Sequence, residues 1–175
     1  MPLLGSYALY LFWRPAKFVN YGELIEPVPL AEVVLSERGG GEFRFGELRG
    51  RWVLLTVDRG ACDSHCRQKL LHLRQARLAQ GADQDRVERL WLVSDGLQPP
   101  AGLDREFHGT RTVLLEERGF LARLPAVRSP SEHIYLVDPM GNLMMRFPHL
   151  ADPNRMKKDL GRLLRLSQGW RQIRR

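Results

Sequence analysis

The feature that most constrains the fold of this chain is the apolar, β-branched run Trp52–Asp58, which leads through Gly60 into a long helical pattern. A continuous run of this kind is typical of a strand buried on both faces of a sheet. From Cys62 to Gln80 the chain has no proline or glycine, and apolar residues recur at helical spacing. A helix is therefore predicted over 62–80, and Gly81 is suited to end it.

The segments that follow indicate the rest of the fold. Four segments have the length and composition of strands: 90–94, 110–115, 133–138 and 143–147. A fifth segment, 116–124, has those of a short helix. Pro139–Asn142 is a hairpin turn, and Asp152-Pro153 begins a last helix with Asp as its N-cap. Alternating strands and helices predict parallel pairing, and the hairpin predicts an antiparallel edge. The predicted class is α/β: a thioredoxin-like three-layer sandwich whose central mixed sheet has a C-terminal β-hairpin and helix.

The N-terminal region differs in composition from the rest of the chain. Residues 3–13 are apolar and nearly uncharged, although a full membrane span needs about 20 residues. We interpret 1–13 as a hydrophobic membrane anchor, either complete or the remaining part of a longer one, with a buried N-terminal helix as the alternative. Prolines in 14–35 predict an extended tether. The thioredoxin-like domain is predicted over 36–168, followed by a basic tail, 169–175.

The net charge bears on possible partners. The formal charge is +7 and the pI is about 10, which favours anionic partners. However, the basic residues are interleaved with 20 acidic ones, and the chain has no zinc-finger spacing, aromatic nucleic-acid-binding signature or phosphate-binding loop. We therefore predict no nucleic-acid partner, because an anionic membrane surface or an acidic partner explains the charge equally well.

Cys62 and Cys66 are the only cysteines among the 175 residues. At the start of a helix both are expected to be exposed on one face, and the helix N-terminus is expected to lower the pKa of Cys62. Their four-residue spacing allows a disulfide, or capture of one soft ion such as Cu(I). Spacing alone does not separate metal capture from redox chemistry or from a structural disulfide.

Two histidines are candidates for a third functional group. His133 opens the strand 133–138, which in a thioredoxin-like fold starts close to the cysteine helix, so it is a candidate metal ligand or proton-transfer partner. The alternative is a strand-end histidine bonded to the backbone. His65 lies between the cysteines, and on a helix it is expected to project away from them into solvent.

Several motifs together resemble one known family. Gly60-Ala-Cys62-Asp-Ser-His-Cys66 resembles the Cys-x-x-x-Cys motif of the Sco (SCO/SenC) family, and Ile134–Asn142 resembles its Tyr-Leu-x-x-Pro-x-Gly hairpin. More closely, three segments are similar to a proteobacterial group of membrane-anchored proteins found with cytochrome oxidase assembly genes: Trp13-Arg-Pro15, Asn20–Leu24 and Asp138–Arg146. The resemblance implies a thioredoxin-fold protein anchored in the inner membrane, with its domain in the periplasm.

The resemblance also implies a function and a ligand set. It implies a role in assembling the copper site of cytochrome c oxidase, with the copper-site subunit as partner and copper held by Cys62 and Cys66. His133, which the predicted fold places near them, is the candidate third ligand. Two positions depart from the family pattern: the family has proline after each cysteine, and its copper-binding histidine lies five residues before the tyrosine, where this chain has Pro130.

Three hypotheses follow. The first is an assembly factor that delivers copper or reduces a disulfide in the oxidase subunit. The second is a thiol-disulfide oxidoreductase without copper, with Cys62 as nucleophile and Cys66 as the resolving cysteine. The third is a binding module with a structural disulfide.

Overall fold

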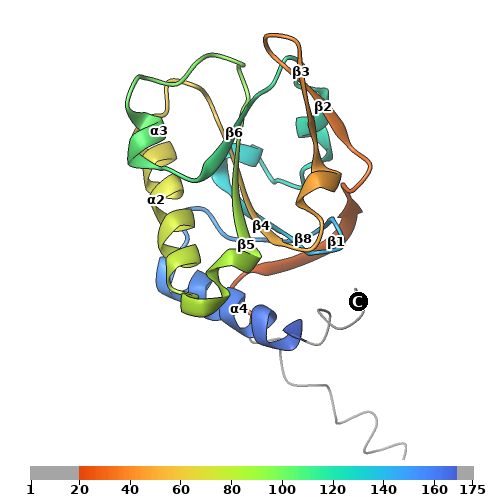
Figure 1. Ribbon diagram of the computed structural model, residues 1–175, viewed down its shortest axis with the longest axis vertical. Helices are drawn as coiled ribbons and strands as arrows, with labels where there is room; N and C mark the ends of the chain where they lie inside the picture. The colour runs from red at the N-terminus through yellow and green to blue at the C-terminus, as the bar shows by residue number, and fades with distance from the viewer. Residues whose placement is uncertain (1–19, 169–175) are drawn as a thin grey trace, which may run out of the picture.

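A six-stranded mixed sheet forms the centre of the structure, a computed structural model that describes residues 20–168 (Figure 1). Its strand order is β1-β8-β7-β4-β5-β6. The bounds are β1 Glu23–Pro29, β4 Trp52–Asp58, β5 Val87–Val93, β6 Thr110–Leu114, β7 Ile134–Val137 and β8 Asn142–Arg146. The β4, β5 and β6 strands pair in parallel, whereas β7 is antiparallel to β4 and β8, and β8 to β1. The predicted mixed sheet is therefore confirmed.

Strand β4 lies inside the sheet because both of its faces are apolar. All seven of its residues are buried, as predicted. Trp52 and Leu54 pack into the core on one face of the sheet, and Val53 and Leu55 into the core on the other. The run of β-branched and aliphatic residues thus supplies side chains to both cores.

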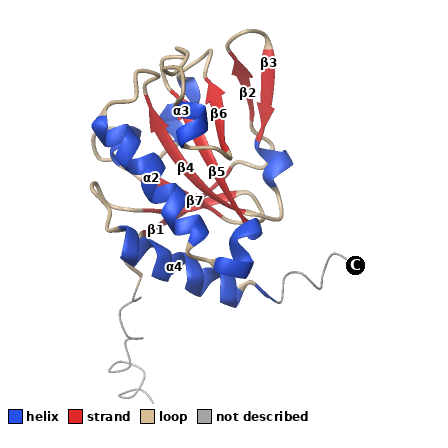
Figure 2. Cartoon of the chain, turned by 60° about the vertical axis from the view of Figure 1, so that its left-hand side comes forward, coloured by secondary structure: helices blue, strands red, loops and turns tan. Residues whose placement is uncertain are grey.

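The α-helices α2 (Ser64–Leu78) and α4 (Pro153–Leu166) lie on only one of these faces, which we call the helical face (Figure 2). The opposite face is covered by the hairpin of β2 (Val34–Glu37) and β3 (Gly41–Arg44), and by two 3-10 helices, η1 (Phe45–Leu48) and η3 (Gly119–Arg123). The remaining short elements are η2 (Gly81–Arg86), α3 (Leu103–Glu106) and η4 (Pro130–Glu132).

Three of the predicted elements differ in extent or type. The helix expected over 62–80 covers 64–78, and the helix expected over 116–124 is the single 3-10 element η3. The third is the boundary between the predicted tether and the predicted domain, where the structure has β2 and the sequence predicts no strand. The hairpin of β2 and β3 forms a separate two-stranded sheet. Its first strand therefore lacks the apolar pattern that identifies a strand of the central sheet.

The tether predicted over 14–35 differs most from the structure. Its described part includes β1, which pairs with β8 as an edge strand of the main sheet, so the folded unit begins before the predicted boundary at residue 36. Pro27 and Pro29 do not prevent this pairing, because an edge strand tolerates residues without an N–H. The backbone N–H groups of Tyr21 and Gly22 also donate to the Asp159 carboxylate of α4, at 2.7 and 2.8 Å.

The predicted anchor, 1–13, and the predicted basic tail, 169–175, lie outside the described residues. Between residues 20 and 168, no helix has the length and apolar character needed to cross a bilayer.

Candidate redox site around Cys62 and Cys66

A tight turn connects β4 to the cysteines. Gly60 has no side chain, and the backbone of Leu97 approaches it where a Cβ would lie. The Gly60 N–H donates to Asp95 Oδ1 at 2.9 Å, so the loop after β5 holds the turn in place. Burial opposes ionisation of Asp95, but hydrogen bonds from Gly60 and Leu97, with Arg59, lower the pKa of its carboxyl. Asp95 is therefore an ionised anchor of the turn.

The first turn of α2 places the two cysteines differently. Asp63 is the N-cap, and its Oδ1 accepts a hydrogen bond from the backbone N–H of Cys66 at 2.9 Å. Cys66 thus lies in the first helical turn, while Cys62 precedes the cap with a positive φ of 43°. The prediction that both cysteines share one helical face is wrong, because the capping carboxylate starts the helix after Cys62.

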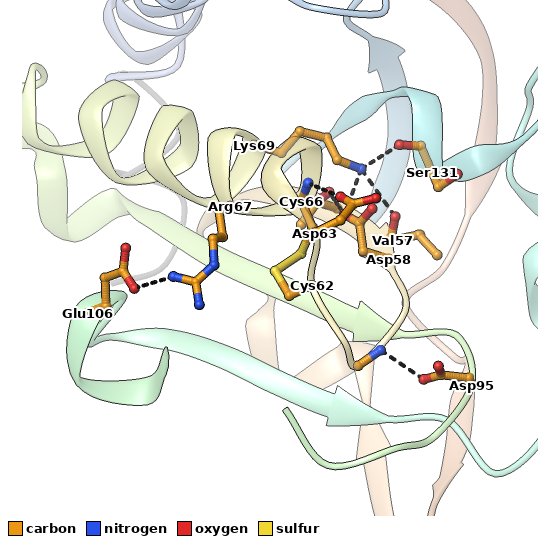
Figure 3. Close-up of a disulfide and its surroundings, with 12 residues drawn as sticks. Val57, Asp58, Cys62, Asp63, Cys66, Arg67, Lys69, Asp95, Glu106 and Ser131 are labelled. Atoms are coloured by element: carbon orange, nitrogen blue, oxygen red, sulfur yellow. Dashed lines mark hydrogen bonds and ion pairs between the residues drawn. A yellow bond between two sulfur atoms is a disulfide. The ribbon is translucent and has the colours of Figure 1, made fainter. Parts of the chain in front are cut away.

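The two cysteines form a disulfide, with their Cα atoms 5.0 Å apart (Figure 3). Both were expected to be exposed, and this is wrong: Cys62 is 4% and Cys66 1% exposed, because both pack into the core of the helical face. Both nevertheless line a hollow of about 560 Å³, together with Asp58, Ser94, Arg118, Pro130 and other residues of the surrounding loops. The disulfide therefore borders a space large enough for part of a partner molecule.

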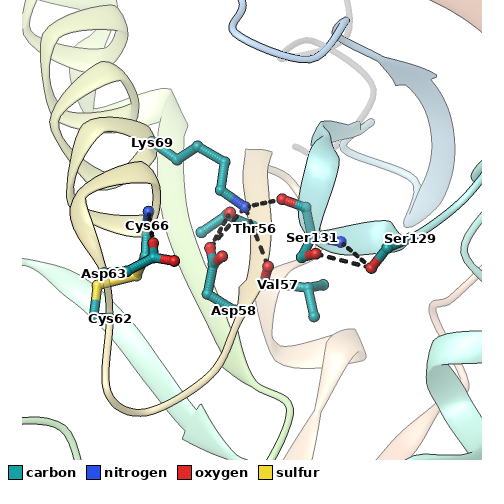
Figure 4. Close-up of polar contacts among 9 residues, drawn as sticks. All are labelled: Thr56, Val57, Asp58, Cys62, Asp63, Cys66, Lys69, Ser129 and Ser131. Atoms are coloured by element: carbon teal, nitrogen blue, oxygen red, sulfur yellow. Dashed lines mark hydrogen bonds and ion pairs between the residues drawn. A yellow bond between two sulfur atoms is a disulfide. The ribbon is translucent and has the colours of Figure 1, made fainter.

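A buried ion pair lies beside the disulfide (Figure 4). Lys69 Nζ lies 2.7 Å from Asp58 Oδ2, and the two side chains are 5% and 9% exposed. The ammonium also donates to the carbonyl oxygens of Val57 and Ser131. Thr56 Oγ1 donates to Asp58 Oδ2 at 3.3 Å. The pair thus joins the end of β4, the helix α2 and the loop at η4.

Burial is the largest cause of the pKa shifts of Asp58 and Lys69. It raises the pKa of the Asp58 carboxyl, although Lys69 and Thr56 oppose the shift. It likewise lowers the pKa of the Lys69 ammonium against the attraction of Asp58. Since Asp58 lines the same hollow as the cysteines, a carboxyl with a raised pKa lies near the disulfide.

The structure does not bring His133 to the disulfide. Its Nδ1 bonds to the carbonyl oxygen of Phe147 at 2.8 Å, and its ring contacts that of Tyr135, whose side chain packs in the core opposite the helical face. His133 is also absent from the residues of 20–168 that line the hollow. Within the described chain, no group of three or more His, Cys, Asp or Glu side chains is arranged to hold a metal ion.

His65 is closer to the site than expected. It lines the hollow together with both cysteines and is only partly exposed. Its ring lies 4.9 Å from that of His149, and its Nε2 is buried without a hydrogen-bond partner among the described residues. Burial, reinforced by Lys69, lowers the pKa of His65, so its imidazole is neutral at neutral pH.

The buried ion pair was missed from the sequence, although the sequence contains a signal for it. Lys69 lies three residues after Cys66 and four before Leu73, which places it in the apolar stripe of the helix. An acid, Asp58, ends the preceding buried strand. A lysine in an apolar stripe next to such an acid indicates a buried pair, because an isolated charge there is too costly.

The model of one protein family, described as "Transmembrane-like, thioredoxin-like, C-terminal domain", matches residues 52–167. The chain belongs to this family. The matched region begins at β4 and contains the cysteines, Asp58 and Lys69. No curated protein matches the chain.

Solved structures share the fold. Yeast Sco1 with copper bound has a TM-score of 0.64 and 15% identity, covering 81% of this chain and 95% of that one. The thioredoxin domain of a thiol-disulfide oxidoreductase from Bacteroides vulgatus has a TM-score of 0.57 and 19% identity, covering 80% and 99%. BsSco, described as a member of the Sco family of cytochrome c oxidase assembly proteins with a disulfide switch, has a TM-score of 0.57 and 12% identity, covering 82% and 96%. The predicted thioredoxin-like fold of Sco type is confirmed.

Proposed function

We propose that this protein is a Sco-like assembly factor for the copper site of cytochrome c oxidase, and that it acts by thiol-disulfide exchange at Cys62 and Cys66. The observation that carries the proposal is the disulfide in the wall of an open hollow, beside the buried carboxyl of Asp58. The shared fold with BsSco and with a thiol-disulfide oxidoreductase supports it.

The exchange starts from the reduced pair. The Cys62 thiolate attacks a disulfide of the partner, which forms a mixed disulfide and releases one partner thiolate. The Cys66 thiolate then attacks Cys62 Sγ, which releases the second partner thiolate and closes the Cys62–Cys66 disulfide. The partner gains two electrons and two protons, and a dithiol donor must later reduce this protein.

Asp58 and the helix N-terminus suit these steps. The first turn of α2 stabilises a Cys66 thiolate through its free N–H groups. Asp58, with its raised proton affinity, accepts the proton that Cys66 loses before it attacks. Lys69 keeps the carboxylate in place and compensates its charge.

Copper is the second candidate activity, with the ion as cargo. The copper-bound fold relative, yeast Sco1, favours it. After reduction, Cys62 and Cys66 supply two thiolates, the ligands that Cu(I) prefers. The sequence makes His133 a candidate third ligand, whereas the geometry favours His65, which lines the hollow and whose Nε2 has no hydrogen-bond partner among the described residues.

Anchoring in the inner membrane, with the domain in the periplasm, completes this proposal. The description of the family as transmembrane-like and the apolar composition of 1–13 support it. The periplasm is oxidising, which suits a cysteine pair that alternates between dithiol and disulfide.

The decisive experiment is a redox titration with glutathione mixtures, followed by mixed-disulfide trapping. We expect an exchangeable potential above about −300 mV, whereas a lower value would indicate an inert structural bond. The Cys66→Ser variant should trap a partner peptide disulfide on Cys62, and Cys62→Ser should not trap it on Cys66. Equal trapping by both variants would contradict the assigned roles.

Copper is tested on the reduced protein by Cu(I) titration against a competing chelator. Wild type, His65→Ala, His133→Ala and the control His108→Ala are compared. Loss of affinity in His65→Ala alone supports the geometric assignment, and loss in His133→Ala alone supports the candidate predicted from the sequence. Absence of a tight site in wild type removes the copper activity and leaves the exchange activity standing.

A further inference from the structure

A second buried cation lies on the helical face, away from the disulfide. Arg89 of β5 is 5% exposed. It pairs in register with Thr110 of β6, and Trp91 pairs with Thr112, so these four side chains extend from the same face of the sheet. Trp91 packs in the core of the helical face, which identifies that face.

Polar groups in this cluster lack partners. Arg89 Nη2 donates to the carbonyl oxygen of His108, but its Nε and Nη1 have no hydrogen-bond partner among residues 20–168. Within the same range, the indole N–H of Trp91 and the hydroxyl of Thr110 have none either. No carboxylate of the described chain forms an ion pair with Arg89. Buried donors of this kind are costly unless an acceptor satisfies them.

A hollow of about 310 Å³ lies beside this cluster, and Trp91 and Thr110 are among the residues that line it. Their unpartnered polar atoms are covered by the wall of the hollow, and Leu70, Leu103 and Phe107 provide apolar surface. Arg89 lies immediately behind the wall of the hollow. Gly109 is part of that wall, and its backbone, with φ of +83° and no side chain, lies close to the Arg89 guanidinium. The exposed Asp104 is at the rim.

Two further cations lie near Arg89. Burial, followed by the nearby Arg77 and Arg74, lowers the pKa of Arg89, so an anion in the hollow would stabilise its charged form. Leu103 and Asp104 of α3 line the hollow. Helix α3 lies beside α2 (Figure 1), and the Arg67–Glu106 ion pair at 2.7 Å connects the two helices. The hollow is therefore a defined space between two connected elements.

We propose that this hollow is a binding site for a small apolar monocarboxylate. The Trp91 indole N–H and the Thr110 hydroxyl bind the carboxylate, Arg89 supplies the compensating charge, and the apolar walls contact the carbon chain. Donors combined with apolar walls select this class over inorganic phosphate, which has no apolar part, and over alcohols, which have no charge. The site is independent of the proposed redox activity.

The test is a titration of the full chain with hexanoate, followed by ¹H–¹⁵N NMR. The chain has four tryptophans, and the Trp91 indole signal is the one lost in Trp91→Phe. We expect hexanoate to shift the Trp91 indole signal and to leave that of Trp52 in place, because the Trp52 N–H already donates to Ser167 Oγ at 3.2 Å.

Variants make the result specific. Trp91→Phe keeps an aromatic ring but removes the indole N–H, and it should weaken hexanoate binding about tenfold, the effect of one hydrogen bond to a charged group. Trp52→Phe is the matched control, since Trp52 is also 2% exposed, and should leave the affinity unchanged. Arg89→Met should abolish binding.

Three outcomes would overturn the proposal. They are equal binding of 1-hexanol, equal or tighter binding of inorganic phosphate, and the absence of any shift of the Trp91 indole at millimolar hexanoate. If Arg89→Met does not fold, Trp91→Phe and its Trp52→Phe control still decide the question.

Discussion

Two buried cations on the same face of the sheet have opposite environments. Lys69 is 4% exposed and has a carboxylate and two carbonyl oxygens as partners. Arg89 is 5% exposed and bonds only one carbonyl oxygen among the described residues. The comparison shows that burial alone does not indicate the role of a charge. A fully paired cation fixes the structure around it, whereas an incompletely paired one retains donors for a ligand.

The largest expected effect comes from breaking the paired cation. Lys69→Met leaves Asp58 buried without its counter-ion and should lower the free energy of unfolding by about 3–5 kcal/mol, measured by urea denaturation. The Asp58→Leu/Lys69→Met double variant removes both charges and should recover most of the loss. A double variant as unstable as Lys69→Met would show that the loss comes from packing.

Reduction of the disulfide tests how far each cation is coupled to the redox pair. Opening so short a loop should cost about 2 kcal/mol of stability. In Arg89→Met the cost should agree with wild type within about 0.5 kcal/mol, because the two sites share no partners. In Asp58→Asn it should differ by more than that, since Asp58 lines the same hollow as the cysteines. Equal costs in all three proteins would contradict the coupling.

Removal of the unpaired cation should have a much smaller effect. Arg89→Met loses one hydrogen bond to the His108 carbonyl but also removes the cost of a buried charge without a carboxylate. We expect a change within about 1 kcal/mol in either direction, by the same denaturation measurement. A loss of 3 kcal/mol or more, like that expected for Lys69→Met, would show that Arg89 has a structural role.

The smallest effect concerns the pH dependence of stability near the paired cation. His72 lies with Lys69 on α2, and burial lowers the pKa of its imidazole. As pH falls, the unfolded chain therefore protonates His72 at a higher pH than the folded protein does. The free energy of unfolding should fall as pH decreases from the pKa of the unfolded state, about 6.5, to below the lower pKa of the folded state. His72→Gln should flatten this slope in denaturation curves between pH 7 and 5. Arg89→Met should keep it, and a His72→Gln slope equal to wild type would exclude this contribution.

Local patterns predicted most of the fold. The burial of β4 follows from its unbroken apolar run, and the start of α4 from Asp152, whose side chain accepts a hydrogen bond from Asn154 N–H. The position of the cysteines after β4 was also predicted. By contrast, β1 was taken for a tether, because its edge position depends on pairing with β8, more than a hundred residues later in the chain.

The candidate site was predicted in part. The sequence by itself determined that Cys62 and Cys66 follow a buried strand at the start of a helix, because apolar periodicity acts over a few residues. Their spacing allowed a disulfide without deciding it. Only the tertiary structure decided that Lys69 pairs with Asp58, that Arg89 finds no carboxylate among the described residues, and that His133 bonds to Phe147. Those outcomes depend on which distant atoms approach each side chain: Ser131, for example, is 62 residues from the lysine that it bonds. Spacing along the chain encodes burial, but the partner of a buried polar group is encoded only in the packed fold.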